Sequence, residues 1–268
     1  MIISVEPVVE RTYRECATTQ IEIRVDGWEG DTFCLWLPEN VSADFGDHIW
    51  KNWGGEAIDQ HFTPMGRDGF FWQYRDARSE TYCDLVIKNS YLDITCSVVN
   101  KSPRAFPNAY LQNCLHFPKA PSFSSKNGET VYIRCDGEWI PVSMTRHWFS
   151  RKEHTLPNTT KFFFRGDTLH EGRYRFCLDN RNVDPERSDH PLIIKVSRDR
   201  KRTIGIAGGN WDFVFHNDNP ILGCIHSQPL PVEIKPQKKA TFKQRIYFCE
   251  SNHESLIEQH ANDALAIC

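Results

Sequence analysis

Apolar and polar residues alternate with a period of two along most of this chain, which is the pattern of β-strands with one buried face. Residues 19–25 show it clearly, because Ile21 and Ile23 alternate with polar side chains. Residues 83–103 hold two such runs around a polar turn at Asn89 and predict a β-hairpin. Short runs of the same kind recur along the rest of the chain, so we expect an all-β fold.

One helical pattern stands out, over residues 251–267. Ser251 followed by Glu254 predicts an N-terminal capping box, and apolar residues follow at helical spacing. Linkers rich in Gly, Ser or Pro and short repeats are missing from the sequence. We therefore expect one domain over residues 1–268, a large antiparallel β-sandwich with a short C-terminal helix, in which residues 1–80 form the N-terminal strands and loops.

Charge and composition argue against two classes of function. The chain has 32 Lys and Arg against 35 Asp and Glu, so it lacks the basic surface that binds nucleic acid. No run approaches the roughly 18 apolar residues of a membrane span, and the N-terminus does not resemble a signal peptide. We expect a cytoplasmic protein without nucleic-acid or membrane partners. Because no export signal is seen, its ten cysteines should be mostly free thiols, and the absence of C-x-x-C spacing agrees with this.

A Cys-x-His arrangement occurs twice, and a proline follows each histidine within three positions. On a strand, Cys114 and His116 share one face, as do Cys224 and His226. We take each proline to end its strand, so that each histidine sits at the rim of the sheet, where ligand sites form. The alternatives are buried thiols with structural histidines, or a Cys2His2 metal site formed by two neighbouring strands.

Ligands on one flat strand face reach a common tetrahedron poorly. We therefore expect no cofactor, with a divalent metal as the alternative. A histidine near its ordinary pKa exchanges protons at neutral pH, which suits acid–base chemistry on a ligand.

Three stretches carry a resemblance to a known family: LDITCSVVNKSP (92–103), NCLHFPKAPSF (113–123) and the run over 219–248 that contains GCIHSQPLP. They resemble bacterial proteins of the galactose-mutarotase-like superfamily, in an uncharacterised branch. The resemblance implies a supersandwich, a large antiparallel β-sandwich whose concave face binds sugars. Epimerases and domains of polysaccharide lyases and glycoside hydrolases belong to this group.

The chain departs from the true aldose 1-epimerases of that superfamily. Those enzymes carry an Asn-His-x-Tyr-Phe-Asn motif around a catalytic histidine, and the nearest string here, FHNDNP (215–220), does not match it. No epimerase acid or base is therefore assigned by resemblance, and the reaction stays open between an epimerase and a lyase.

Two further stretches offer groups for a sugar. Trp50, Trp53 and His61 follow no strand period, and tryptophans on such loops stack against sugar rings or else plug the edge of a sandwich. Residues 144–158 are rich in cationic side chains, which bind a carboxylate or sulfate of an acidic sugar or form a solvated loop.

We expect carbohydrate recognition on the concave face, with conversion by a histidine and a carboxylate. The candidate catalytic residues are His116, His147 and His226. The candidate substrate-binding residues are Trp50, Trp53, His61, Asn113, Arg146 and His154. The alternatives are a non-catalytic sugar-binding protein and a metal-dependent enzyme that uses some of the histidines.

Overall fold

The computed structural model describes residues 1–13, 16–44, 46–51, 62–66, 68–124, 128–145, 159–163, 186–217 and 223–267. Their strands form two antiparallel sheets of nine strands each, here called sheet A and sheet B. Sheet A contains β1 (Ile3–Tyr13), β2 (Cys16–Val25), β3 (Thr32–Asp44), β4 (Asp47–Lys51), β9 (Phe106–Lys119), β12 (Thr159–Phe163), β15 (Trp211–Asn217), β16 (Cys224–Pro229) and β17 (Val232–Ile234).

Sheet B contains β5 (Phe62–Pro64), β6 (Gly69–Arg75), β7 (Ser79–Ile87), β8 (Tyr91–Asn100), β10 (Val131–Cys135), β11 (Glu138–Pro141), β13 (Ile193–Val196), β14 (Thr203–Gly208) and β18 (Lys239–Cys249). Two 3-10 turns, η1 (Pro121–Phe123) and η2 (Val142–Met144), and the helix α2 (His253–Leu265) complete the described elements. The all-β sandwich expected from the sequence is therefore confirmed. Its extent as one domain over 1–268 stays a prediction.

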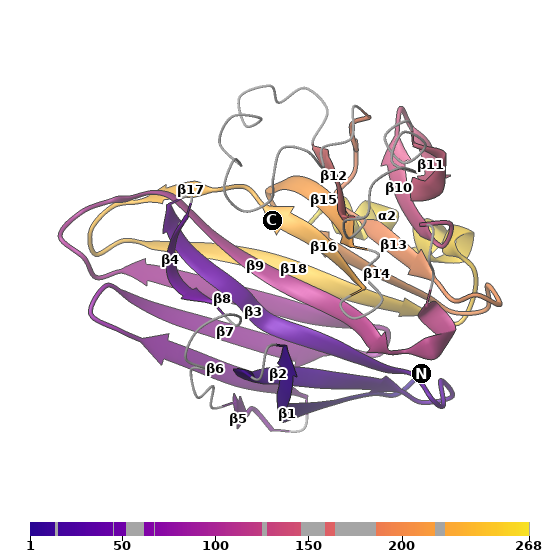
Figure 1. Ribbon diagram of the computed structural model, residues 1–268, viewed down its shortest axis with the longest axis horizontal. Coiled ribbons are helices and arrows are strands. Elements are labelled where there is room, and N and C mark those ends of the chain that lie inside the picture. The colour runs from indigo at the N-terminus through magenta and orange to yellow at the C-terminus, as the bar shows by residue number, and fades with distance from the viewer. Residues whose placement is uncertain are drawn as a thin grey trace.

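Figure 1 shows the sheets as two layers, with β3 and β9 of sheet A over β7 and β8 of sheet B. The facing sides of the sheets form one hydrophobic core. The alternation read from the sequence places Ile21 and Ile23 of β2 in this core, both fully buried. The hairpin at Asn89 is the pair β7 and β8, in which Leu92 and Ile94 are buried on the inner face.

The helix α2 covers the outer face of sheet B, where it packs on β13, β14 and β18 through Leu256 and Ala264. The N-cap lies one residue later than predicted. It is Asn252, whose side chain accepts the backbone N–H of Ser255 at 3.2 Å, and the helix begins at His253. The choice of Ser251 as the cap was therefore wrong. No helix in the described part of the chain is long and apolar enough to cross a membrane.

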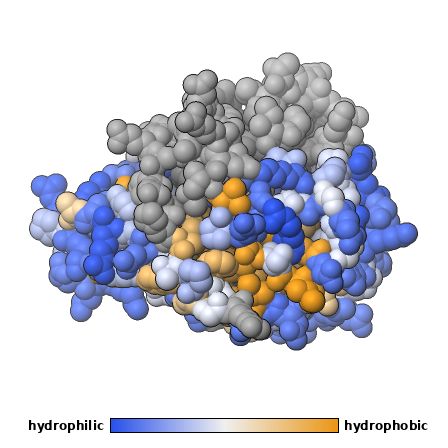
Figure 2. All heavy atoms as spheres, turned by 90° about the horizontal axis from the view of Figure 1, so that it is seen from below, coloured by the Kyte–Doolittle hydropathy of each residue, from blue (hydrophilic) through white to orange (hydrophobic). Residues whose placement is uncertain are grey.

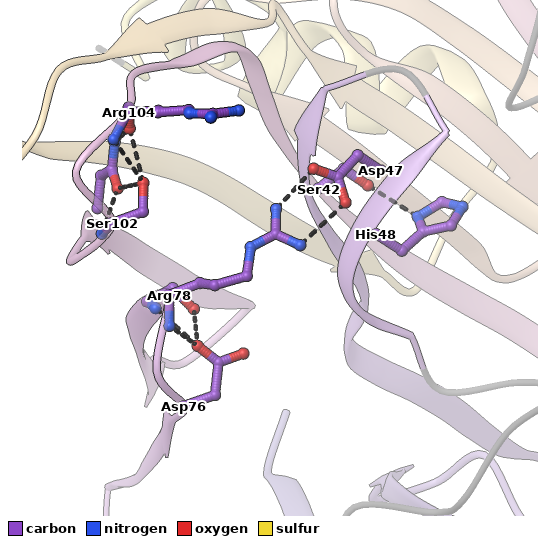
Figure 3. A network of polar contacts seen from close by, with 9 residues as sticks. Ser42, Asp47, His48, Asp76, Arg78, Ser102 and Arg104 are labelled. Carbon is purple, nitrogen blue, oxygen red and sulfur yellow. Dashed lines mark hydrogen bonds and ion pairs between the residues drawn. The ribbon is translucent and has the colours of Figure 1, made fainter.

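Arg78, in the turn between β6 and β7, forms an ion pair between the two sheets (Figure 3). Its guanidinium donates two hydrogen bonds to the carboxylate of Asp47 on β4, at 3.0 and 2.6 Å, and so joins sheet B to sheet A. The carboxylate of Asp76 accepts the backbone N–H of Arg78 at 2.7 Å and fixes the turn. Because both side chains of the ion pair are about half exposed, it stabilises the fold by about 0–1 kcal/mol.

The hydrophobic core reaches the surface along one edge of the sandwich. Seen from below, Figure 2 shows apolar residues in the middle of this side and polar residues at both ends. Strands β1, β5 and β6 lie on this side in Figure 1, and their partly buried Val5, Phe62 and Phe70 pack against the core. The outer strands of the two sheets, β1 and β5, therefore leave this edge of the core without a covering strand among the described residues.

Candidate functional site

The two Cys-x-His strands, β9 and β16, are neighbours in sheet A and run antiparallel. Cys224 pairs with His116, and continuing the register by two residues places His226 opposite Cys114. The intervening Leu115 and its partner on β16 face the core between the sheets. The cysteines and histidines therefore share the outer face of sheet A, which is the face turned away from sheet B.

The proline after each histidine does lie at or next to the end of its strand, but the expected open rim is wrong. Strand β16 ends at Pro229, three residues beyond His226, and β9 ends at Lys119, one residue beyond Pro118. The exposed fractions of His116 and His226 are only 3% and 1%, so neither lies at an open rim. Pro38, in contrast, lies inside β3, which continues to Asp44.

These prolines are tolerated for a local reason. Proline removes only one backbone donor, and a strand can hold it where the ladder is irregular. The register of β3 with β9 shifts around Pro38 and again around Pro118. Neither position then requires a ladder hydrogen bond from the proline nitrogen.

The imidazole of His226 lies against two thiols. Its Nε2 is 2.9 Å from Sγ of Cys114 and 3.0 Å from Sγ of Cys224. Its ring stacks on Phe215 of β15, with the centroids 3.8 Å apart and an interplanar angle of 13°. Burial, together with the neighbouring His116, lowers the pKa of His226 well below its ordinary value, so the imidazole is neutral.

A carboxyl group faces the other nitrogen of this ring. Oε2 of Glu39 lies 3.8 Å from Nδ1 of His226 and accepts a hydrogen bond from Nε2 of Gln112 at 2.6 Å. Burial raises the pKa of Glu39 to about 8, against the hydrogen bonds from Gln112 and Cys114, which lower it. The Glu39 side chain is 14% exposed against 2% for His226, so the carboxyl is the part of this arrangement nearer to solvent.

We call Glu39, Gln112, Cys114, Cys224 and His226 the His226 cluster. Sequence reasoning found its histidine but missed Glu39, because Glu39 directly follows Pro38 and a proline indicates the end of a strand. The sequence carries no local signal for it, because a Pro-Glu-Asn string is equally typical of a turn.

His116 does not join this cluster. Its ring centroid lies 4.1 Å from that of Trp36, and among the described residues its Nε2 has no hydrogen-bond partner. Burial lowers the pKa of His116 to about 3. Its side chain is therefore a neutral ring packed against an indole, and its predicted catalytic role stays a prediction.

Two candidate substrate-binding residues lie in the interior between the sheets. Asn113 donates a hydrogen bond from Nδ2 to Oε1 of Gln244 on β18, and Gln244 donates in turn to the carbonyl of Ser227. Trp50 is 4% exposed and lies 5.5 Å from Trp72, ring centroid to ring centroid. These positions favour structural roles, and we include neither residue in the site below.

The predicted site residues Trp53, His61, Arg146, His147 and His154 lie outside the described part of the chain.

Two cavities lined by described residues lie away from the His226 cluster. One of about 520 Å³ adjoins β1 and β2, and one of about 440 Å³ lies between β8, β18 and the end of α2. The chemistry of its side chains, and not a cavity, singles out the His226 cluster.

Neither protein-family models nor curated proteins match this sequence. Solved structures do match. The Slr1438 protein from Synechocystis sp. has 10% identity and a TM-score of 0.50, over 92% of each chain. A galactose mutarotase-like protein from Clostridium acetobutylicum has 12% identity and a TM-score of 0.49, over 92% of this chain and 93% of the other.

A galactose mutarotase related enzyme from Lactobacillus acidophilus has 10% identity and a TM-score of 0.46, over 93% of this chain and 99% of the other. Identities this low concern the fold alone, because one fold hosts many functions. The likeness to the Slr1438 structure therefore bears on the fold alone, and it agrees with the large antiparallel β-sandwich described above.

Proposed function

We propose that this protein binds a carbohydrate on the outer face of sheet A and converts it by acid–base chemistry at Glu39. The observation that carries the proposal is the placement of a carboxyl beside an imidazole, with Oε2 of Glu39 3.8 Å from Nδ1 of His226. Carbohydrate as the substrate class comes from the sequence resemblance described above. The sequence predicts conversion by a histidine and a carboxylate, and we propose Glu39 as that carboxylate.

Glu39 is the member of the pair that can meet a substrate, because its side chain is 14% exposed and that of His226 is 2% exposed. Opening an aldose ring requires a proton on the ring oxygen and removal of a proton from the anomeric hydroxyl. A carboxyl group can donate a proton from one oxygen and accept one at the other. The protons then balance, and Glu39 ends in the state in which it began.

His226 and Gln112 act through Glu39 in this proposal. The Gln112 amide donates to Oε2 at 2.6 Å and lies 3.4 Å from Nδ1 of the imidazole. Stacking on Phe215 keeps the imidazole in place. His226 is therefore a positioning residue, which refines the catalytic role expected from the sequence.

The test compares the wild type with Glu39→Gln, which keeps the shape of the side chain and removes its acid. Mutarotation of a panel of free aldoses is followed by polarimetry, and eliminative cleavage of uronic-acid oligosaccharides by ultraviolet absorbance. We expect conversion to fall by at least about 100-fold in Glu39→Gln, which is the usual contribution of a general acid–base group. The matched control is Glu138→Gln, an exposed glutamate on β11 of sheet B.

Full activity of Glu39→Gln would refute the role of this carboxyl. Binding of a sugar by the wild type without conversion would instead identify a non-catalytic sugar-binding protein. Absence of both binding and conversion across the panel would refute the proposed function altogether.

A further inference from the structure

Three metal-ligand atoms converge at the centre of the His226 cluster. Sγ of Cys114, Sγ of Cys224 and Nε2 of His226 all lie within 4.8 Å of one another. All three residues are buried, and both thiols are free. Within the described ranges, no other three histidine, cysteine or acidic side chains come together in this way.

We propose that Cys114, Cys224 and His226 bind a zinc ion through two thiolates and the Nε2 atom. Two thiolates and one imidazole are a ligand set that zinc accepts, with a fourth position left over. The difficulty of placing ligands on one flat strand is removed by the register. Cys114 comes from β9 and the other two from β16, and the antiparallel pairing sets His226 opposite Cys114.

The distances fit after a small adjustment. In a tetrahedral site, zinc lies about 2.3 Å from each sulfur and about 2.0 Å from the imidazole nitrogen, so each sulfur is about 3.5 Å from that nitrogen. The two sulfur-to-Nε2 distances are 2.9 and 3.0 Å. An outward movement of about half an ångström, within reach of a side-chain rotation, accommodates the ion.

Charge favours an ion at this point. A zinc ion takes up both sulfurs as thiolates. Two thiolates, a neutral imidazole and a divalent ion sum to zero charge, which suits a buried site. Thiolate ligands also favour zinc over magnesium or calcium.

The surroundings of the other ring nitrogen match those of a metal-bound histidine. Such a histidine usually donates its second ring N–H to a carboxylate or carbonyl, which fixes its tautomer. Oε2 of Glu39 lies 3.8 Å from Nδ1 of His226, and a closer approach would let it accept this N–H. The zinc inference goes beyond the proposed function, because it requires no sugar and no proton transfer by Glu39.

The test begins with the metal content of the purified full-length protein, measured by plasma mass spectrometry after dialysis into metal-free buffer. We expect about one zinc ion per chain. Replacement by cobalt should give the thiolate-to-cobalt charge-transfer absorption and the intense visible bands of a tetrahedral site. Cys114→Ser and Cys224→Ser should lower the zinc affinity at least about tenfold.

The matched control is Cys34→Ser, a buried thiol on β3 that pairs with His116 and lies outside the three ligands. This variant should keep its zinc. Folded wild-type protein that takes up neither zinc nor cobalt would overturn the proposal, and so would an equal loss of zinc in Cys34→Ser. Should the cysteine variants fail to fold, the cobalt spectrum of the wild type decides alone.

The two proposals fail separately. A metal-free protein whose sugar conversion still depends on Glu39 refutes only the zinc site. A zinc-loaded protein that neither binds nor converts a sugar refutes only the proposed function.

Discussion

Protonation of one buried histidine, His190, should weaken the attachment of the C-terminal helix. His190 is 2% exposed and lies just before β13. Its Nδ1 accepts the backbone N–H of Leu192 at 3.2 Å, and its Nε2 lies 3.1 Å from the carbonyl oxygen of Ala261 on α2. Both ring nitrogens are engaged in the neutral form, so an added proton breaks the contact with Leu192.

Burial lowers the pKa of His190 to about 4, and the charge of Arg134 acts in the same direction. The hydrogen bond to Ala261 and the charge of Asp189 oppose the shift. In the unfolded chain the pKa is about 6.5. As the pH falls below that value, the unfolded state binds a proton that the folded state does not, and stability decreases until the pH reaches about 4.

The magnitude follows from the two pKa values. One pKa unit corresponds to about 1.4 kcal/mol, so at about pH 5.5, one unit below the unfolded pKa, His190 destabilises the fold by about 1.4 kcal/mol. The assay is urea unfolding of the wild type and His190→Gln at about pH 7.5 and about pH 5.5. The variant starts from a lower stability, by about 1–3 kcal/mol, because Leu192 and Ala261 lose a partner.

The decisive quantity is the difference in pH dependence between the two proteins. The wild type should lose about 1.4 kcal/mol more than His190→Gln on acidification, since every other titrating group is common to both. Equal losses in the two proteins would refute the assignment of a depressed pKa to His190.

Three further predictions concern the sandwich itself. Asn113→Ala should lower the free energy of unfolding by about 1–3 kcal/mol in urea, because Oε1 of Gln244 loses its donor between the sheets, and an unchanged midpoint would contradict this. Gly69→Ala should destabilise by about 1–3 kcal/mol or more, because a Cβ there overlaps the backbone carbonyl of Leu85, and wild-type stability would show that the strands are further apart. Thiol titration of the unfolded, unreduced protein should find close to all ten cysteines, and a count several short of ten would reveal disulfides.

The strands and the hydrophobic core were predictable because their signal is local. The period of two identifies which residues face inward whatever the partner strand is, and Leu92 and Ile94 are accordingly buried. The same period places Asn113 on the opposite face from Cys114, so a stricter use of it would have excluded Asn113 from the His226 cluster.

The course of β3 through Pro38 was not predictable in this way. A proline stops a strand only where its missing N–H is required, and the partner strand determines that requirement. At Pro38 the register with β9 shifts, so β3 continues and brings Glu39 to the outer face of sheet A. The adjacency of β9 and β16, which brings Cys114 to His226, also depends on strand order across 110 residues and not on local pattern.

The central claim is that this protein meets its substrate on the outer face of sheet A, at Glu39. A crystal structure with a bound sugar, chosen from the panel by its binding, tests that claim most directly. The account predicts a sugar oxygen at about 2.6–3.2 Å from the Glu39 carboxyl, the reach of a proton transfer. A sugar bound elsewhere, for example in the cavity beside β1 and β2, with Glu39 still contacting only protein, would contradict it.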